Sequence, residues 1–226
     1  MSAAERPGTA HAASRPVVRP LRRLAYPAAR EAMRAFTLAR APDTRDEIWL
    51  VEHEPVFTLG LAGREVHLLA PGDIPVVHTE RGGQVTYHGP GQVLAYTLID
   101  LRRRELMVRE FVDLLEQAVI ELLTDLGLIA LRREGAPGVY VSTADGRPGA
   151  KISSIGIKVT HGRAWHGLAL NADMDLEPFT RIDPCGYPGL IMTDLRRALA
   201  PAAPPPTETV ATLLGEKLAD LIEGIR

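Results

Sequence analysis

A single cysteine, Cys185, is the residue with the most reactive side chain in this sequence of 226 residues. It lies in the segment Asp183-Pro184-Cys185-Gly186-Tyr187, with proline before it and glycine after it. A free cysteine is most often a small buried apolar side chain, but a turn made of proline and glycine does not require one. Such a turn could hold the thiol as a nucleophile, provided that a base or a cation beside it favours the thiolate.

Lysine is so rare in this chain that each lysine needs a reason. Of the 26 basic residues only Lys151, Lys158 and Lys217 are lysines. Lys151 opens the segment KISSIGIK, and strand alternation would place Lys151, Ser153 and Ile155 on one face. A neutral Lys151 could take the proton of the thiol, whereas a protonated Lys151 could stabilise the thiolate. A lysine at the end of a strand commonly lies in solvent, and we assign that role to Lys158.

A glycine-rich segment at residues 81–92, RGGQVTYHGPGQ, is a second candidate for binding. The pair Gly82-Gly83 would let the backbone approach a ligand closely because neither residue has a Cβ atom. Arg81 and His88 place hydrogen-bond donors toward its two ends. The segment could cradle a phosphate or line a slot for an acyl chain, although no Gly-Lys-Ser/Thr follows as in a phosphate-binding loop. A tight β-turn with a solvated arginine and a buried histidine would require no ligand.

The segment HGLALN, residues 166–171, is a third candidate. His166 either belongs to a site or ends a strand, and the small residues after it would let a ligand lie against the backbone. Asp173 and Asp175 follow closely, but their spacing does not make a metal site, and we expect no metal.

Composition excludes several classes of protein. A hydrophobic fraction of 46% with a net charge of -2 is unlike a disordered chain or a basic nucleic-acid-binding protein, so no nucleic-acid partner is expected. One cysteine forms neither an internal disulfide nor a cysteine-rich metal centre. No apolar run approaches the ~18 residues of a membrane span, and residues 1–18 have no apolar secretory core. We therefore expect a cytoplasmic protein with no membrane partner.

The hydrophobic pattern predicts helices alternating with short strands. The clearest helix covers residues 107–126 and ends at Gly127. Residues 152–160 and 164–172 look like a hairpin around His161-Gly162. Residues 52–63 are predicted to be a loop, and Thr193 to cap a short helix. The other predicted strands are residues 19–26, 48–51, 75–78, 92–101 and 138–142, and the other predicted helices are residues 27–40, 193–199 and 207–225.

These elements indicate a mixed α+β fold, with a mixed sheet packed against helices, and not a doubly wound parallel sheet. The length suits one domain. Residues 1–18 are interpreted as a flexible N-terminal lead-in and residues 19–200 as the catalytic domain. Residues 201–226 are interpreted as a proline-rich linker and a C-terminal helix that packs on the same domain.

Taken in order, the motifs resemble those of the octanoyltransferases of lipoate biosynthesis, also called lipoyl(octanoyl) transferases. The resemblance is carried by RGGQVTYHGPGQVLAY, GVYV, KISSIGIKV, HGLALN and DPCGY. It spans residues 81–187 at least. It implies the α/β catalytic core shared with biotin and lipoate protein ligases. It also implies transfer of an octanoyl group from octanoyl-acyl carrier protein to a lysine of a lipoyl domain, with no cofactor.

The resemblance assigns roles to particular residues. The acyl-thioester cysteine of the family maps to Cys185, and the lysine that favours its ionisation maps to Lys151. The implied acceptors are the lipoyl domains of 2-oxoacid dehydrogenase complexes and the glycine cleavage H protein. We expect a monomer and an acyl slot near Val85, Ile155 and Leu168. We also expect a local arginine face, for which Arg64, Arg81 and Arg163 are the candidates. The implied substrate-binding residues are Arg81, Gly82, Gly83, Gln84, Val85, Thr86, Tyr87, His88, Ser154, Ile155, Gly156, Gly167, Leu168 and Ala169.

Three other functions remain compatible with the sequence. An ATP-dependent lipoate or octanoate ligase would share the fold but would need an adenylate-binding site and no catalytic cysteine. A carrier-to-carrier lipoyl amidotransferase would share the thiol chemistry but take its acyl group from another donor. A binding module that kept the fold would have neither activity.

Overall fold

The computed structural model of the chain describes residues 14–225. Within them, seven strands form the main sheet in the order β1-β2-β6-β10-β9-β8-β7, and three form a smaller sheet in the order β4-β3-β5. Only β1–β2 in the main sheet and β3–β4 in the smaller one are parallel pairs. The strands are β1 (Val17–Arg23), β2 (Glu47–Glu52), β3 (Val56–Leu59), β4 (Val76–His78), β5 (Val85–His88), β6 (Gln92–Asp100), β7 (Ala130–Arg132), β8 (Val139–Ser142), β9 (Pro148–Thr160) and β10 (Arg163–Asn171).

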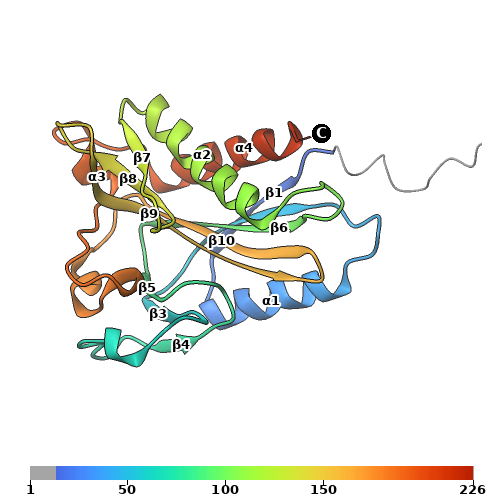
Figure 1. Cartoon of the computed structure of the whole chain (residues 1–226), viewed down its shortest axis with the longest axis horizontal. Helices are drawn as coiled ribbons and strands as arrows, with labels where there is room; N and C mark the ends of the chain where they lie inside the picture. Colours follow the sequence, from blue (N-terminus) through green and yellow to red (C-terminus); the bar gives the residue numbers. More distant parts are fainter. Residues whose placement is uncertain (1–13, 226) are drawn as a thin grey trace, which may run out of the picture.

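Helices cover both faces of the main sheet (Figure 1). Helices α2 (Val108–Asp125) and α4 (Thr207–Glu223) pack together on one face, and α1 (Tyr26–Ala39) lies on the other beside the smaller sheet. A short helix, α3 (Leu195–Ala198), precedes the proline-rich segment. None of the helices among residues 14–225 has the length and hydropathy needed to cross a membrane.

The core has three parts that follow these layers. The largest lies between the main sheet and α2 and α4, where the apolar stripe of α2 at i, i+3 and i+4 spacing is buried. The second lies between the sheet and α1. The third packs against the smaller sheet and includes Phe57, Tyr87 and Phe179. The predicted binding segments, residues 81–88, 154–156 and 167–169, meet between the main sheet and the smaller one.

Most predicted elements are present, and the differences occur where runs are short. Residues 52–63 were predicted to be a loop, but β3 lies within them. Its four residues are all buried, and four residues between Pro55 and Gly60 are too few to show a period. Asp194, and not Thr193, caps α3, because its side chain accepts from the Arg197 N–H. Strand β1 begins at Val17, and most of the lead-in predicted at residues 1–18 lies outside the described residues.

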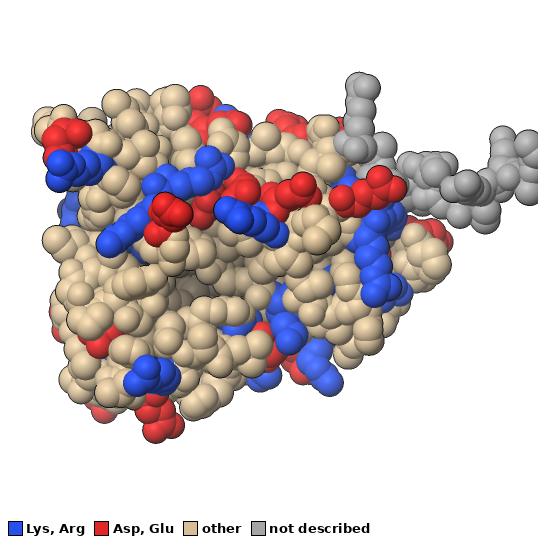
Figure 2. Space-filling model, viewed as in Figure 1, with Lys and Arg blue, Asp and Glu red and all other residues tan. Residues whose placement is uncertain are grey.

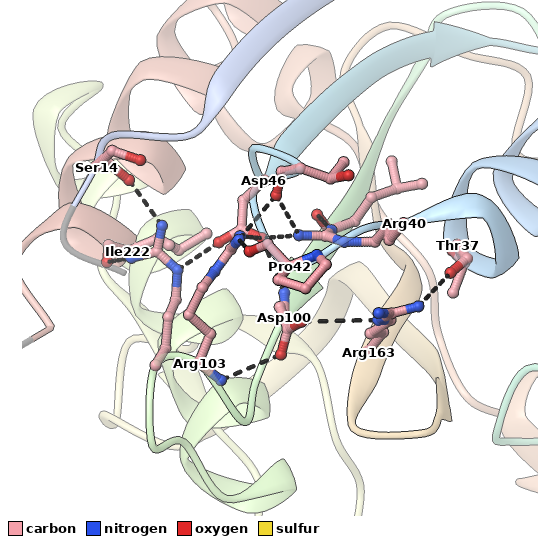
Figure 3. A network of polar contacts seen from close by, with 12 residues as sticks. Ser14, Thr37, Arg40, Pro42, Asp46, Asp100, Arg103, Arg163 and Ile222 are labelled. Carbon is pink, nitrogen blue, oxygen red and sulfur yellow. Dashed lines mark hydrogen bonds and ion pairs between the residues drawn. The ribbon is translucent and has the colours of Figure 1, made fainter. Parts of the chain in front are cut away.

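A buried carboxylate, that of Asp46, joins several chain segments at one end of the main sheet (Figure 3). It accepts from Arg40, from Arg103 Nη2 at 2.7 Å and from Arg104 Nε at 2.6 Å. Arg104 also donates to the carbonyls of Ser14 and Ile222. One acid therefore links the end of α1, the end of β6, the chain before β1 and the end of α4.

Candidate active site

A cavity of about 420 Å³ lies between the two sheets and the first turns of α2. Its volume falls within the roughly 300–1,000 Å³ typical of small-molecule sites. Figure 2 shows the hollow in the middle of one face of the molecule, with basic side chains above and below it. Most of the surface that lines it is apolar, and such a wall suits an aliphatic ligand.

Cys185 and Lys151 meet at the wall of this cavity. The Lys151 Nζ atom donates to Cys185 Sγ at 3.2 Å and to the Pro137 carbonyl at 2.8 Å. It also lies 5.4 Å from the ring centre of Tyr140, within the range of a cation–π contact. Lys151 is 1% exposed. A buried amine with these three neighbours can exchange a proton with the thiol or stabilise its thiolate.

A β-bulge sets the direction of the Lys151 side chain. Tyr140 of β8 pairs with Lys151 and Val139 pairs with Ser153, so β9 has one more residue than β8 at Ile152. Ile152 and Ile155 consequently pack into the same core. The prediction that Lys151, Ser153 and Ile155 share one face is therefore wrong, since the bulge interrupts the alternation.

The turn around Cys185 is held by its own backbone. Cys185 has φ of 58° and Gly186 has φ of 75°, and both values are left-handed. The Gly186 N–H donates to the Asp183 carbonyl at 2.9 Å, and the Asp183 carboxylate contacts His67 Nδ1 at 3.1 Å. A left-handed conformation costs a residue such as cysteine about 1–3 kcal/mol and persists only where its surroundings enforce it. These contacts fix where the thiol points.

The loop at residues 81–84 seals one side of the cavity against β9. The Gly82 N–H donates to the Ile157 carbonyl at 2.9 Å, and a Cβ atom on Gly156 would lie 3.0 Å from Arg81 Cδ. Arg81 itself is buried and donates to Thr58 and to the loop carbonyls of Gly82 and Gln84. Burial lowers the pKa of Arg81. Its bonds show that Arg81 holds the loop from within.

All but one of the predicted substrate-binding residues line the cavity. Tyr87 lies elsewhere, because strand alternation in β5 turns it away from the side of Thr86 and His88. Its ring packs 5.5 Å from Phe57 in the core of the smaller sheet. The lining residues from the prediction are Arg81, Gly82, Gly83, Gln84, Val85, Thr86, His88, Ser154, Ile155, Gly156, Gly167, Leu168 and Ala169, together with Lys151 and Cys185.

Other lining residues were not predicted from the sequence. Val108 and Val112 are one helical turn apart at the start of α2, and Val108 is 47% exposed there. In the sequence both valines belong to the same apolar series as the buried residues of α2, so the pattern alone does not mark them as cavity residues. His166, which the sequence left either in a site or at the end of a strand, also lines the cavity. The remaining lining residues beyond the prediction are Tyr26, Leu94, Tyr96, Ala136, Pro137, Ile157 and Tyr187.

Burial favours the neutral form of both histidines that line the cavity. Burial, with His53 nearby, lowers the pKa of His88 to about 3. His88 Nδ1 lies 2.8 Å from Gln92 Oε1. Burial also lowers the pKa of His166, against the influence of Glu80. His166 has a left-handed φ of 61° within β10, and its Nε2 lies 3.4 Å from Glu80 Oε1.

Two backbone N–H groups near the thiol are already engaged. The Gly186 N–H donates within its own turn, and the Gly82 N–H donates to the Ile157 carbonyl. Neither of these two groups is free to bind an oxyanion. No group of three or more His, Cys, Asp or Glu side chains within residues 14–225 is arranged to hold a metal ion.

Comparisons with known proteins identify the family of this chain. Residues 26–219 match the family described as lipoyl protein ligase A/B catalytic domain. An octanoyltransferase of Bordetella parapertussis is 65% identical over 166 residues, which are 73% of this chain and 75% of the relative. An octanoyltransferase of Pseudomonas putida is 60% identical over 171 residues, which are 76% of this chain and 77% of the relative.

Solved structures of lower identity share the fold. A bi-partite lipoate protein ligase from Thermoplasma acidophilum has a TM-score of 0.70 at 13% identity, over 92% of this chain and 83% of that one. The biotin protein ligase of Aquifex aeolicus has a TM-score of 0.55 at 9% identity, over 91% of this chain and 70% of that one. The mixed α/β fold is thus the one seen in lipoate and biotin protein ligases. The sequence identity and the family match together show that this chain belongs to the lipoyl protein ligase A/B catalytic domain family, among its octanoyltransferases.

Proposed function

We propose that this chain moves an octanoyl group from octanoyl-acyl carrier protein to a specific lysine of lipoyl domains, through an octanoyl thioester on Cys185. The observation that carries the proposal is the 3.2 Å contact between Lys151 Nζ and Cys185 Sγ at the wall of an apolar cavity. The cysteine is the only one in the chain and one of its three lysines stands beside it. That pairing supports a covalent acyltransferase over an ATP-dependent ligase on the same fold, which would need no catalytic cysteine.

The first half of the reaction is an exchange of thioesters. The Cys185 thiolate attacks the carbonyl carbon of the donor thioester, a new C–S bond forms, and the donor C–S bond breaks. The departing thiolate of the carrier takes a proton from the Lys151 ammonium. One thioester replaces another, so the step is nearly thermoneutral and requires no ATP.

The second half forms an amide. A neutral lysine of the acceptor attacks the Cys185 thioester, the C–N bond forms, and the thiolate of Cys185 leaves. Lys151 is then neutral and takes the proton of the attacking amine. His88 is unsuited to this task because burial and the nearby His53 lower the pKa of His88 to about 3. Lys151 thus ends the cycle protonated, as it began.

The cavity supports an aliphatic acyl group. Each buried CH₂ contributes about 0.8 kcal/mol, and Val85, Ile155 and Leu168 are among the apolar lining residues. A Cβ atom on Gly167 would lie 2.0 Å from the Ala95 carbonyl oxygen, and one on Gly156 would lie 3.0 Å from Arg81 Cδ and 3.1 Å from the Gly82 carbonyl oxygen. These glycines let the strands and the loop close around a narrow chain.

Two arginines beside lining residues support an acidic carrier as donor and lipoyl domains of 2-oxoacid dehydrogenase complexes or the glycine cleavage H protein as acceptors. The Arg64 N–H donates to Gln84 Oε1 at 3.2 Å, and Arg109 directly follows Val108. Of the arginines expected to form this face, Arg81 is buried and Arg163 pairs with Asp100 at 3.7 Å. We propose that the protein works as a cytoplasmic monomer.

The intact mass of the protein after mixing with octanoyl-acyl carrier protein tests the proposal. We expect one octanoyl adduct, removable by hydroxylamine as a thioester is, and none on Cys185→Ala. Lys151→Ala should slow adduct formation most near neutral pH. An acceptor lipoyl domain added afterwards should discharge the adduct and gain the octanoyl group.

The same assay separates the rival functions. Transfer from free octanoate and ATP that survives Cys185→Ala would identify a ligase. Faster loading from octanoylated H protein than from octanoyl-acyl carrier protein would identify an amidotransferase. A chain that forms no adduct with either donor would be a binding module, and the proposal would fail.

A further inference from the structure

The position of the Lys151 amine depends on a carbonyl outside the predicted motifs. Lys151 Nζ donates to the Pro137 carbonyl at 2.8 Å, a shorter contact than its 3.2 Å contact with Cys185 Sγ. Pro137 lies in the connection between β7 and β8, beside the exposed Gly135. Exposed connections are commonly mobile, so a carbonyl that anchors a buried amine needs support of its own.

The residue after Pro137 packs directly on the lysine side chain. Gly138 has φ of 125°, and a Cβ atom there would lie 2.6 Å from Lys151 Cε and 3.1 Å from Lys151 Nζ. The backbone of Gly138 therefore touches the end of the lysine, which lies between it and the thiol. Any displacement of this backbone changes where the amine can lie.

A buried carboxylate on α2 holds that backbone. Glu116 Oε1 accepts from the Gly138 N–H at 2.8 Å, and Glu116 Oε2 accepts from Arg132 Nε at 3.0 Å. The Glu116 side chain is only 7% exposed. Glutamate is rarely buried unless paired, and the other buried side chains of α2 are apolar. Glu116 thus occupies a position on α2 that an apolar residue could fill. Its Oε1 atom instead accepts from Gly138, in the segment that anchors Lys151.

We propose that Glu116 is a positioning residue: by accepting the Gly138 N–H it holds the Pro137 carbonyl and the Gly138 backbone against Lys151, and so keeps the amine beside Cys185. The inference rests on the proposed function only in taking Cys185 as the reactive group. Glu116 touches neither the thiol nor the acyl group in this arrangement. Its effect passes through two backbone groups to the amine.

Alkylation of Cys185 by iodoacetamide as a function of pH tests the proposal, because it reports thiolate formation and requires no acyl donor. Loss of the carboxylate in Glu116→Ala should raise the pH midpoint of alkylation by about one unit, which corresponds to a roughly tenfold slower reaction near neutral pH. Glu116→Gln keeps an acceptor oxygen for Gly138 and should keep the midpoint of the unmodified protein. Acylation by octanoyl-acyl carrier protein should follow the same order.

A second variant separates loss of the hydrogen-bond acceptor from loss of the fold. Glu116→Leu matches the apolar neighbours on the buried face of α2 and should fold, yet it lacks the acceptor and should show the shift of Glu116→Ala. Gln117→Ala, one residue along the same helix, should leave the midpoint unchanged, since the Gln117 side chain hydrogen-bonds to Glu121 and Arg132 and not to the Gly138 backbone.

Two results would overturn the proposal. One is an unchanged midpoint in Glu116→Leu, or a rate reduced equally at every pH, since only a structural role gives that pattern. The other is a shift in Glu116→Gln as large as in Glu116→Ala, which would assign the effect to charge. If the midpoints shift as expected but no octanoyl adduct forms on the unmodified protein, the positioning role holds and the proposed function fails.

Discussion

Cys185 reaches Lys151 through a backbone conformation that glycine adopts far more easily than cysteine. Its φ of 58° is maintained by the Gly186 N–H bond to Asp183 and by the contact of Asp183 with His67. A conformation that costs about 1–3 kcal/mol and is held on several sides points to a role for the side chain it directs. Here the direction is toward an amine with a second anchor, the Pro137 carbonyl.

Substitution of Gly138, whose backbone lies against the Lys151 side chain, tests how strictly the amine must be placed. Gly138→Ala would place a Cβ atom 2.4 Å from the Ser153 carbonyl oxygen and 2.6 Å from Lys151 Cε, so both the backbone of β9 and the lysine side chain must move. We expect acylation of Cys185 to slow by about 100-fold, the effect expected of a displacement of about 1 Å. Gly146→Ala is the matched control, because Gly146 also has a positive φ, of 76°, but no atom within 4 Å of its Cβ position. Intact mass against time measures both, and equal rates in the two variants would show that backbone strain alone is responsible.

The two reactive residues could be predicted from the sequence because their types are rare in this chain. The spatial partners of Lys151 could not be predicted, since Pro137 and Gly138 belong to a connection whose path depends on Glu116 of α2. Tyr87 shows that a motif can also predict a binding residue that does not line the cavity. Its motif suggested a binding role, but the alternation of β5 buries its ring in the smaller sheet.

The buried guanidinium of Arg81 shapes the loop at residues 81–84, which closes one side of the cavity. Arg81 Nη2 donates to the Thr58 carbonyl at 2.7 Å and to the Gln84 carbonyl at 2.9 Å, while Nη1 donates to the Gly82 carbonyl at 2.8 Å. These bonds join both ends of the loop to β3. The loop then bonds β9 through Gly82 and Ile157.

Arg81→Lys tests this role, because lysine keeps the charge but has one nitrogen in place of the planar fork. Losing a charge-assisted hydrogen bond and leaving carbonyls unpaired should lower the free energy of unfolding by about 2–3 kcal/mol. The looser wall should also raise KM for the octanoyl donor more than it lowers kcat. Arg64→Lys, at an exposed arginine nearby, should change neither. Urea unfolding and steady-state kinetics measure both effects, and an unchanged stability would remove the structural role.

Long periodic elements were predictable, whereas short ones depended on their neighbours. Helix α2 and the β9–β10 hairpin have enough residues for a period to appear. Strand β3 has four buried residues and exists because β4 and β5 pair with it on both sides. Strand β7 has three residues and pairs only with β8, so the sequence pattern did not reveal it.

The buried carboxylate of Asp46 and three buried histidines make the stability of the fold sensitive to acid. Although burial opposes it, the bond from the Asp100 N–H and the charges of Arg104 and Arg40 lower the pKa of Asp46. The folded state therefore keeps this carboxylate ionised to a lower pH than the unfolded chain does, and that stabilisation is lost as the pH falls through the folded value. Burial lowers the pKa of His53, His88 and His166 in the folded state, so the unfolded chain binds their protons first.

The free energy of unfolding should thus decline in two stages as the pH is lowered. The first begins near pH ~6.5, where the histidines of the unfolded chain take up protons, and extends toward pH 3 because the pKa of His88 is about 3. The second begins near pH ~4, where Asp46 of the unfolded chain becomes protonated.

Asp46→Asn separates the two stages. Removing the charge leaves Arg103 and the buried Arg40 and Arg104 without their common partner, and we expect a loss of about 3–5 kcal/mol at neutral pH. The decline below pH ~4 should become shallower, because the substituted residue no longer titrates, while the histidine stage should persist. Asp43→Asn, three positions earlier and exposed, is the control and should follow the unmodified protein throughout. Urea unfolding at a series of pH values measures the curves. A curve for Asp46→Asn that runs parallel to that of the unmodified protein down to the lowest pH would show that Asp46 does not account for the second stage.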